Sequence, residues 1–217
     1  MKKQVIDSIE HNTIIAILRG IADDDLIDVA EALYEWGIRL LEITYSANGS
    51  VSDERTAQNI HRLVQRMDGR MLIGAGTVIS RKQVALTHRA GGRFIISPNT
   101  DKRVIRESNR RGLVSIPGAL TPSEIADADR YGADFVKLFP ITNLGVGYIK
   151  AVRAPLSHVK LLAVGGINDT NMGDYLAAGV YGFGVGSNIT DKKLIETKEW
   201  AGITALAQRY TEGIQHG

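Results

Sequence analysis

The chain has 217 residues, no cysteine and a formal net charge of +2 at pH 7, from 26 Lys and Arg residues against 24 Asp and Glu residues. The lack of cysteine excludes disulfides and thiolate chemistry, and the charges form no basic stripe of the kind that binds nucleic acid or a membrane surface. The length suits one domain. Since no apolar run is long enough for a signal peptide or a membrane span, we expect a soluble protein of the cytoplasm.

Eight short apolar segments recur along the chain, and each is followed by a turn and a stretch with helical spacing. The expected strands cover residues 13–18, 39–44, 71–75, 93–97, 113–117, 134–139, 160–164 and 181–185. Strands that are continuously apolar are typical of parallel sheets covered by helices. Eight such units with short connections predict a single (β/α)8 TIM barrel over residues 1–217, and the alternative is a doubly wound sheet of similar length.

The ends of the helical stretches carry recognisable signals. Residues that favour helix N-termini precede several of them: Asp23, Asp24 and Asp25, Ser80, Asp101, Thr121 with Pro122 and Glu124, and Asp169. Glycine follows several of them just before the next strand, at Gly37, Gly91, Gly112, Gly132 and Gly179. The repeated order of helix, glycine and strand favours the barrel.

Four polar residues lie at or near the C-terminal ends of expected strands: Arg19, Glu42, Thr77 and Lys137. In a (β/α)8 barrel these ends converge on one mouth, where the reactive groups are placed. We therefore treat these four side chains as the candidate site.

Lys137 lies within an otherwise apolar strand, and Phe135 and Phe139 share its face. Apolar surroundings lower the pKa of a lysine, and the uncharged amine can form an imine with a keto acid. The alternative is a lysine that is paired with a carboxylate or that extends to the rim of the barrel for structural reasons.

Glu42 is the corresponding carboxylate in the second strand. Burying it is costly unless it is paired or functional, and a carboxylate with a raised pKa can move protons during imine chemistry. A salt bridge to Lys137 without chemistry is the alternative, and it too would place the two residues side by side.

Two glycine-rich turns follow the seventh and eighth strands, and they contain Gly165 and Gly166 and then Gly186 and Ser187. Barrel enzymes often bind phosphate with backbone N–H groups at these two strand ends. Each turn alone is a weak signal because glycine turns are common, but the pair predicts a phosphate site.

Thr77 and Arg19 could together bind a carboxylate, Thr77 through its hydroxyl and Arg19 through a bidentate contact. Structural explanations compete with both roles. Thr77 could cap the helix that starts near Ser80, and Arg19 could pair with the acidic run at residues 23–25.

Metal and dinucleotide sites lack their usual signals. The histidines show no ligand spacing and lie away from the expected strand ends, at His11, His61, His88, His158 and His216. No GxGxxG follows the first strand. We expect no metal and no cofactor.

At this level of detail the sequence resembles the 2-keto-3-deoxy-6-phosphogluconate (KDPG) and 4-hydroxy-2-oxoglutarate (KHG) aldolases. The likeness extends from Ile14 to about Asn188 and rests on these motifs, in this order: IIAILRG, LEIT, IGAGTV, ISPNT, IPGALTPSE, FVKLFP, AVGGIN and GVGSN. FVKLFP and IGAGTV are highly specific, whereas the glycine motifs occur in many phosphate-binding barrels.

The resemblance implies a metal-free homotrimer that reversibly splits a 2-keto-3-deoxy-6-phospho sugar acid, or 4-hydroxy-2-oxoglutarate, into pyruvate and an aldehyde, glyceraldehyde 3-phosphate or glyoxylate. Through the matching motifs it also implies residue roles. Lys137 would form the Schiff base and Glu42 would be the acid/base; Thr77 would hold the carboxylate; Pro98 and Phe139 would line the keto-acid pocket; and Gly165, Gly166, Gly186 and Ser187 would receive the phosphate.

Two positions depart from the gluconate-type pattern. Where that pattern has a carboxylate-binding Arg after the Glu, this chain has Ser46, and where it often has Thr before the paired glycines, this chain has Val164. Arg19 in ILRG would then supply the charge, as in the related 6-phosphogalactonate-type (KDPGal) aldolases. The substrate's configuration at C4 is therefore open between the two types.

Two further functions compete with the aldolase. A non-catalytic phosphosugar-binding barrel would share the glycine turns, and a metal-free isomerase or epimerase could use Glu42 as a base. The isomerase gives no reason for Lys137.

Overall fold

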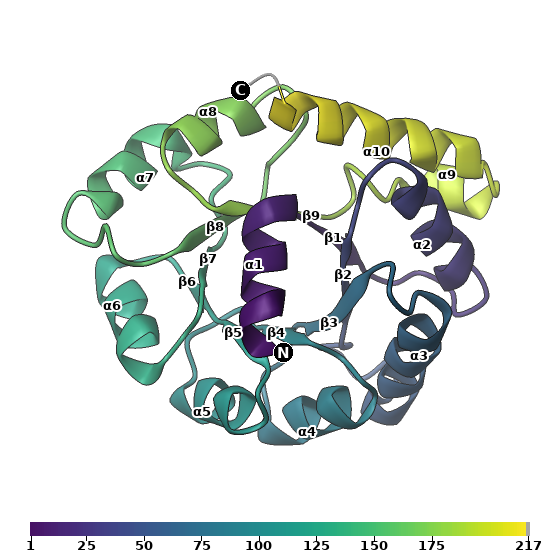
Figure 1. Cartoon of the computed structure of the whole chain (residues 1–217), viewed down its shortest axis with the longest axis horizontal. Helices are drawn as coiled ribbons and strands as arrows, with labels where there is room; N and C mark the ends of the chain where they lie inside the picture. Colours follow the sequence, from purple (N-terminus) through teal and green to yellow (C-terminus); the bar gives the residue numbers. More distant parts are fainter. Residues whose placement is uncertain (216–217) are drawn as a thin grey trace.

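In the computed structural model, which describes residues 1–215, a ring of parallel strands is surrounded by helices (Figure 1). The strands are β1 (Ile14–Leu18), β2 (Leu40–Thr44), β3 (Leu72–Gly76), β4 (Phe94–Ile96), β5 (Val114–Ile116), β6 (Gly118–Ala119), β7 (Val136–Leu138), β8 (Leu161–Val164) and β9 (Gly182–Val185). The helices are α1 (Lys2–Asn12), α2 (Leu26–Glu35), α3 (Asp53–Arg66), α4 (Arg81–Arg89), α5 (Lys102–Arg110), α6 (Pro122–Tyr131), α7 (Gly145–Arg153), α8 (Met172–Ala177), α9 (Lys192–Glu196) and α10 (Trp200–Gln215). The single domain was expected over residues 1–217, so its last two residues lie outside the described range.

The nine strand segments correspond to the eight expected strands, because Pro117 divides the fifth strand into β5 and β6. The sheet order runs β5-β4-β3-β2-β1-β9-β8-β7-β6, so these two pieces lie at its two ends. Proline has no N–H to donate, which interrupts the ladder at this point. The Ser97 N–H donates to the Ile116 carbonyl at 3.1 Å, and the Lys137 N–H donates to the Pro117 carbonyl at 2.9 Å. The barrel prediction is confirmed, and the doubly wound alternative is wrong.

Most of the expected helix starts are found, with one error. Ser80 caps α4, Asp101 caps α5, and Thr121 forms a reciprocal capping box with Glu124 at the start of α6. Asp25 occupies the N-cap position of α2 without a side-chain bond. Asp169 was wrongly assigned as a cap, because α8 begins at Met172 and Asp169 instead pairs with Arg209 at 3.5 Å.

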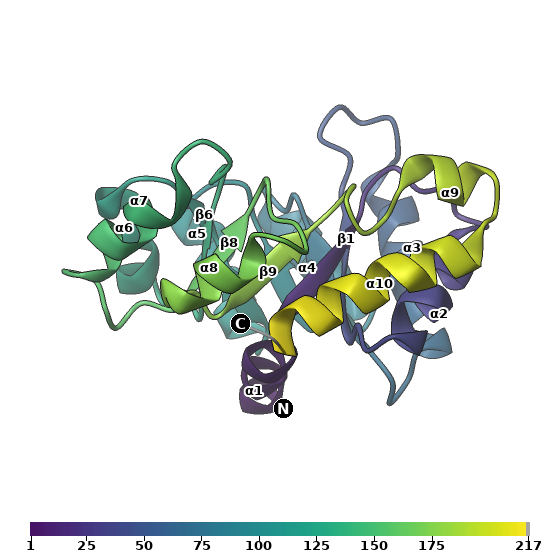
Figure 2. The ribbon, with the colours of Figure 1, turned by 90° about the horizontal axis from the view of Figure 1, so that it is seen from above.

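The N-terminal helix α1 closes the end of the barrel where the strands begin (Figures 1 and 2). Its residues Val5 and Ile9 are buried and pack into one cluster with Ile15, Phe94 and other side chains from inside the barrel. The aromatic ring of Phe94 fills the space beside Gly74, where a Cβ would overlap it. The lower half of the barrel is therefore a packed apolar plug, and polar groups can meet only at the opposite end.

Candidate active site

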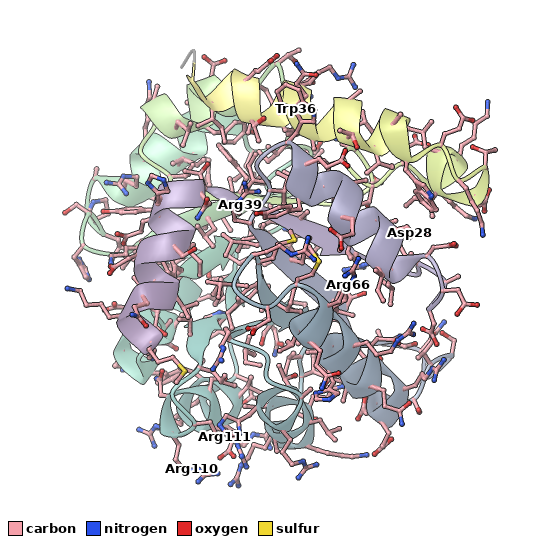
Figure 3. All side chains as sticks on the ribbon, turned by 45° about the vertical axis from the view of Figure 1, so that its right-hand side comes forward. Asp28, Trp36, Arg39, Arg66, Arg110 and Arg111 are labelled. Carbon is pink, nitrogen blue, oxygen red and sulfur yellow. The ribbon has the colours of Figure 1, made fainter. Side chains whose placement is uncertain are left out.

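Lys137 and Glu42 are ionisable side chains buried inside the barrel, with exposed fractions of 5% and 1%. They come from β7 and β2. Glu107 is also buried, but it lies on α5, where it is paired with Arg110 and Arg111, both on the outer surface (Figure 3). Among residues 1–215, Lys137 and Glu42 are the charged residues that are buried and form no salt bridge.

The amine of Lys137 is held in surroundings that disfavour its charge. Burial lowers the pKa of Lys137, the negative charge of Glu42 opposes this, and the positive charge of Arg19 lowers it further. The Nζ atom lies 4.6 Å from the centre of the Phe139 ring. A lowered pKa increases the fraction of uncharged amine at neutral pH, which is the form that attacks a carbonyl.

The carboxyl group of Glu42 is buried without a hydrogen-bond partner on either oxygen within the described part of the chain. Burial raises its pKa, while Lys137 and Arg19 act in the opposite direction. A Cβ at Gly76 would overlap this carboxyl group, so glycine at that position of β3 provides its space. The structural alternative of a direct salt bridge does not hold, since no ion pair between Glu42 and Lys137 occurs in residues 1–215. The unbonded oxygens are free to exchange a proton with a ligand or water.

A cavity of about 580 Å³ is lined by Lys137 and by residues at the carboxyl ends of the strands, the opposite ends from those that α1 covers. Its lining includes most of the expected ligand-binding residues: Arg19, Lys137, Phe139, Gly165, Gly166, Gly186 and Ser187. Gly165 and Gly166 have φ values of 99° and 72°, in the left-handed region that favours glycine. The cavity thus joins the amine to both glycine turns.

A second cavity of about 370 Å³ adjoins the first, and Arg19 lines both. Thr77 and Ser46 also line it. Thr77 has a φ of 56°, which is unusual for a residue with a side chain and places it in a constrained turn. Arg19 is therefore positioned to reach a ligand in either space.

The structural explanations for Arg19 and Thr77 are not supported. Within residues 1–215 no salt bridge joins Arg19 to the acidic run, where Asp23 is bound by Arg55 and Asp25 lies 3.9 Å from Lys198. The N-cap of α4 is Ser80, whose hydroxyl accepts the Gln83 N–H. Both residues remain available for ligand binding.

Two expected residues, Glu42 and Pro98, line neither of these two cavities, and Glu42 lies buried in the barrel wall. Pro98 lies elsewhere, just after β4, the strand segment next to β5. It is exposed, and its carbonyl lies against Gly118, where a Cβ would overlap it. Gly118 is the register partner of Lys137 in the neighbouring strand. Pro98 is therefore close to the strand beside Lys137, with its carbonyl packed against that strand.

The sequence reasoning missed Lys192, which lines the larger cavity from α9. Its amine is 3.4 Å from the carboxylate of Glu196, which lines the same cavity. A lysine and a glutamate four residues apart on a short helix usually indicate a solvated surface. Only the placement of α9 after β9, beside the last glycine turn, brings them to the mouth.

Residues 1–215 contain neither a metal-binding cluster nor a membrane-spanning helix. No group of three or more His, Asp or Glu side chains there is arranged to hold a metal ion. No helix in this range has the length and apolar character needed to cross a bilayer. His216, one of the histidines considered above, lies outside the described residues.

Residues 5–206 match the family model described as KDPG and KHG aldolase. A probable 2-dehydro-3-deoxy-6-phosphogalactonate aldolase of Rhizobium meliloti is 38% identical over 177 residues, 81% of each chain. A solved structure described as native KDPGal has a TM-score of 0.83 and 32% identity, covering 94% of both chains. The KDPG aldolase of Legionella pneumophila, solved with pyruvate captured as a covalent carbinolamine, has a TM-score of 0.81 and 30% identity, covering 90% of this chain and 92% of that one.

Replacing Lys137 with Met should stabilise the fold at neutral pH. Because burial lowers the lysine pKa, the unfolded chain binds more protons than the folded chain between that pKa and the ordinary value near ~10.4. Wild-type stability therefore falls as the pH drops through this window, and Met removes the penalty. If removing this penalty raises the free energy of unfolding by about 1 kcal/mol, Lys137→Met should raise the Tm at pH 7 by about 3 °C. The gain in Tm should shrink towards pH 10.

Thermal unfolding followed by circular dichroism at several pH values measures this difference. Lys150→Met, which removes an exposed lysine from α7, is the matched control and should leave the Tm almost unchanged. A lower Tm for Lys137→Met at pH 7 would contradict the account, because it would mean that the buried ammonium is well compensated.

Proposed function

Because the chain belongs to the KDPG and KHG aldolase family, we propose that its substrate is the galactonate-type member of this class, 2-keto-3-deoxy-6-phosphogalactonate. The chain is a class I aldolase that cleaves keto-deoxy phospho sugar acids to pyruvate and an aldehyde phosphate. The configuration at C4 and the roles of individual residues are the proposed part.

Two observations support the galactonate type. Ser46 and Val164 replace residues of the gluconate-type pattern, and Arg19 lines both cavities at the mouth. The relative from Rhizobium meliloti carries the galactonate name, as does the native KDPGal structure. Turnover of 4-hydroxy-2-oxoglutarate is the second candidate activity, since the matching family model includes it in its name.

Lys137 is the proposed Schiff-base residue, and its burial without an ion pair is the observation that carries the proposal. Its uncharged amine attacks the C2 carbonyl of the substrate, and loss of water from the carbinolamine leaves an imine. The C3–C4 bond then breaks, its electrons move toward the imine nitrogen, and the aldehyde leaves. A barrel that only bound a phosphosugar would not need an unpaired lysine at this depth.

Glu42 is the proposed acid/base. As a carboxylate it accepts the proton of the C4 hydroxyl, directly or through one water, while the aldehyde forms. It then returns a proton to C3 of the enamine to give the pyruvate imine, which water hydrolyses. Its raised pKa and its two unbonded oxygens suit both steps.

Ligand binding is divided between the two sides of Lys137. Arg19 and Thr77 are proposed to hold the keto-acid carboxylate, with Phe139 and Pro98 beside the keto acid. The backbone N–H groups of the two glycine turns are proposed to bind the phosphate, through Gly165, Gly166, Gly186 and Ser187. Lys192 lines the same cavity, together with the Glu196 carboxylate with which it is paired.

The assembly and location are proposed from the family resemblance alone. A homotrimer is the expected oligomer, and the cytoplasm is the expected compartment. Size-exclusion chromatography with light scattering measures the first directly.

The stereochemical proposal predicts a preference between C4 epimers. The kcat/KM for 2-keto-3-deoxy-6-phosphogalactonate should exceed that for the gluconate epimer by at least about tenfold, a difference of about 1.4 kcal/mol between the two transition states. Coupling pyruvate release to lactate dehydrogenase measures both. Equal values, or a preference for the gluconate epimer, would contradict the galactonate assignment and leave the class I mechanism untouched.

Arg19→Ala should weaken pyruvate binding by roughly 2–4 kcal/mol, because the keto-acid carboxylate loses its charged partner in a partly desolvated pocket. Arg19→Lys should restore only part of the loss, since a point charge replaces a planar fork. Steady-state inhibition by pyruvate gives the affinity. Binding within about threefold of wild type would show that Thr77 and backbone N–H groups hold the carboxylate without Arg19.

A further inference from the structure

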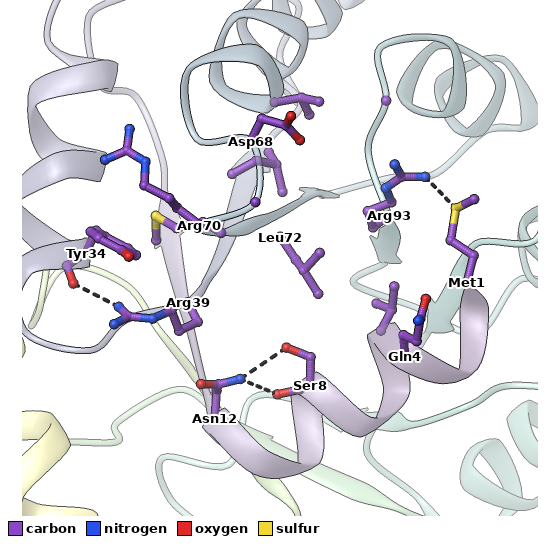
Figure 4. Close-up of a pocket in the computed structure, with 16 residues that line it drawn as sticks. Met1, Gln4, Ser8, Asn12, Tyr34, Arg39, Asp68, Arg70, Leu72 and Arg93 are labelled. Atoms are coloured by element: carbon purple, nitrogen blue, oxygen red, sulfur yellow. Dashed lines mark hydrogen bonds between the residues drawn. The ribbon is translucent and has the colours of Figure 1, made fainter.

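A third cavity, of about 640 Å³, lies at the opposite end of the barrel from the candidate active site. Its walls come from one side of α1 and from the loops that lead into β2, β3 and β4 (Figure 4). Leu72, Met71 and Val64 form its apolar part. The apolar plug of the lower barrel separates this cavity from Lys137, so the proposed aldolase function leaves it unused.

Arginines precede three neighbouring strands at this cavity. Arg39 stands directly before β2, Arg70 two residues before β3, and Arg93 directly before β4. Parallel strands in register begin at the same edge of the barrel, which gathers the three side chains around one space. Figure 3 shows Arg39 in the region between α1 and α2.

The three guanidinium groups differ in how their charge is compensated. Arg70 is neutralised by Glu31 through contacts of 2.6 and 2.9 Å. Within residues 1–215, neither Arg39 nor Arg93 forms a salt bridge. Arg39 donates to the carbonyls of Tyr34 and Ile38 and stacks on the Tyr34 ring at 4.1 Å. Asp68, which also lines the cavity, likewise forms no salt bridge within residues 1–215, so the two free guanidinium groups share this space with one carboxylate and leave it with a net positive charge.

Capping of helix ends accounts for part of this arrangement. Arg39 and Arg70 each donate to a carbonyl at the C-terminal end of the preceding helix, where cations are favoured. Arg93 has no such contact in the described residues, and it donates instead to the thioether sulfur of Met1 at 2.8 Å. A thioether is a weak acceptor for a charged group with five N–H donors. Most N–H donors of the Arg93 guanidinium therefore lack a strong acceptor within residues 1–215.

The facing side of α1 is polar but uncharged. Gln4, Ser8 and Asn12 follow one another at four-residue spacing, so they form one stripe along the helix, and all three line the cavity. The Asn12 amide donates to Ser8, while the Gln4 amide forms no hydrogen bond within residues 1–215. In Figure 4 this stripe borders the cavity on one side, with Arg39 and Arg93 on either side of Leu72.

From this combination we infer that the cavity is a second ligand site, which binds a small phosphorylated sugar acid between α1 and the strand-leading arginines. Each guanidinium takes one anionic end of the ligand, because its planar fork matches carboxylate and phosphate oxygens. The hydroxyl groups of the ligand face the stripe on α1, and its short carbon chain lies on Leu72. The occupied site would fasten α1 to the barrel.

Hydrogen–deuterium exchange of the α1 peptide, residues 2–12, tests this inference with 3-phosphoglycerate as the probe. In the wild-type protein the probe should slow exchange of this peptide at least about threefold. Arg93→Gln should abolish that protection, while Arg106→Gln, which removes an exposed arginine from α5, should retain it. Peptides from the glycine turns at the mouth report binding there in all three proteins, and aldolase turnover should be unchanged in both variants.

Three outcomes would overturn the inference. Exchange of the α1 peptide that does not respond to 3-phosphoglycerate would exclude a site there. Equal protection in wild type and Arg93→Gln would show that the effect comes from the active site. Equal protection by inorganic phosphate at the same concentration would overturn the assignment of a sugar acid, because it would show that the carboxylate and carbon chain of the probe add nothing to binding.

Discussion

Among residues 1–215, the barrel interior buries one amine, that of Lys137, and one carboxyl group, that of Glu42, and the two form no ion pair with each other. In water the two would be fully charged, and in contact they would form a salt bridge that removes both from chemistry. Burial instead shifts the pKa of Lys137 down and that of Glu42 up, so both move toward their neutral forms. This arrangement costs stability, and it suits the proposed roles of Lys137 as the nucleophile and of Glu42 as the proton-transfer group.

The surrounding glycines and aromatic residues make this separation possible. Gly76 leaves the volume that the Glu42 carboxyl occupies, and Gly74 leaves the volume for the ring of Phe94. That ring belongs to the apolar cluster capped by α1, which closes the barrel from below. Lys137 is therefore open to a ligand from the mouth, where Arg19 and the glycine turns line the same cavity.

Much of this architecture could be predicted from the sequence, because the strands are short, mostly apolar runs and a charged residue lies within only two of them among the described residues. Lys137 and Glu42 stood out for that reason. The break at Pro117 could not be assigned, since an edge or a strand end tolerates proline equally well. Lys192 and the arginines before β2, β3 and β4 look like ordinary surface charges, and only the closed barrel shows which of them face a cavity. Asp169 was misassigned because a favourable cap residue in a turn does not determine where the helix starts.

Reductive trapping with pyruvate tests the central claim most directly. Borohydride added to the protein with pyruvate should convert the imine to a stable secondary amine, and peptide mass spectrometry should locate it on Lys137 alone. Lys137→Arg should carry no label under the same conditions, while Lys150→Arg should be labelled as fully as the wild type. A label on another lysine, or none on the wild-type protein, would contradict the assignment of Lys137 as the Schiff-base residue.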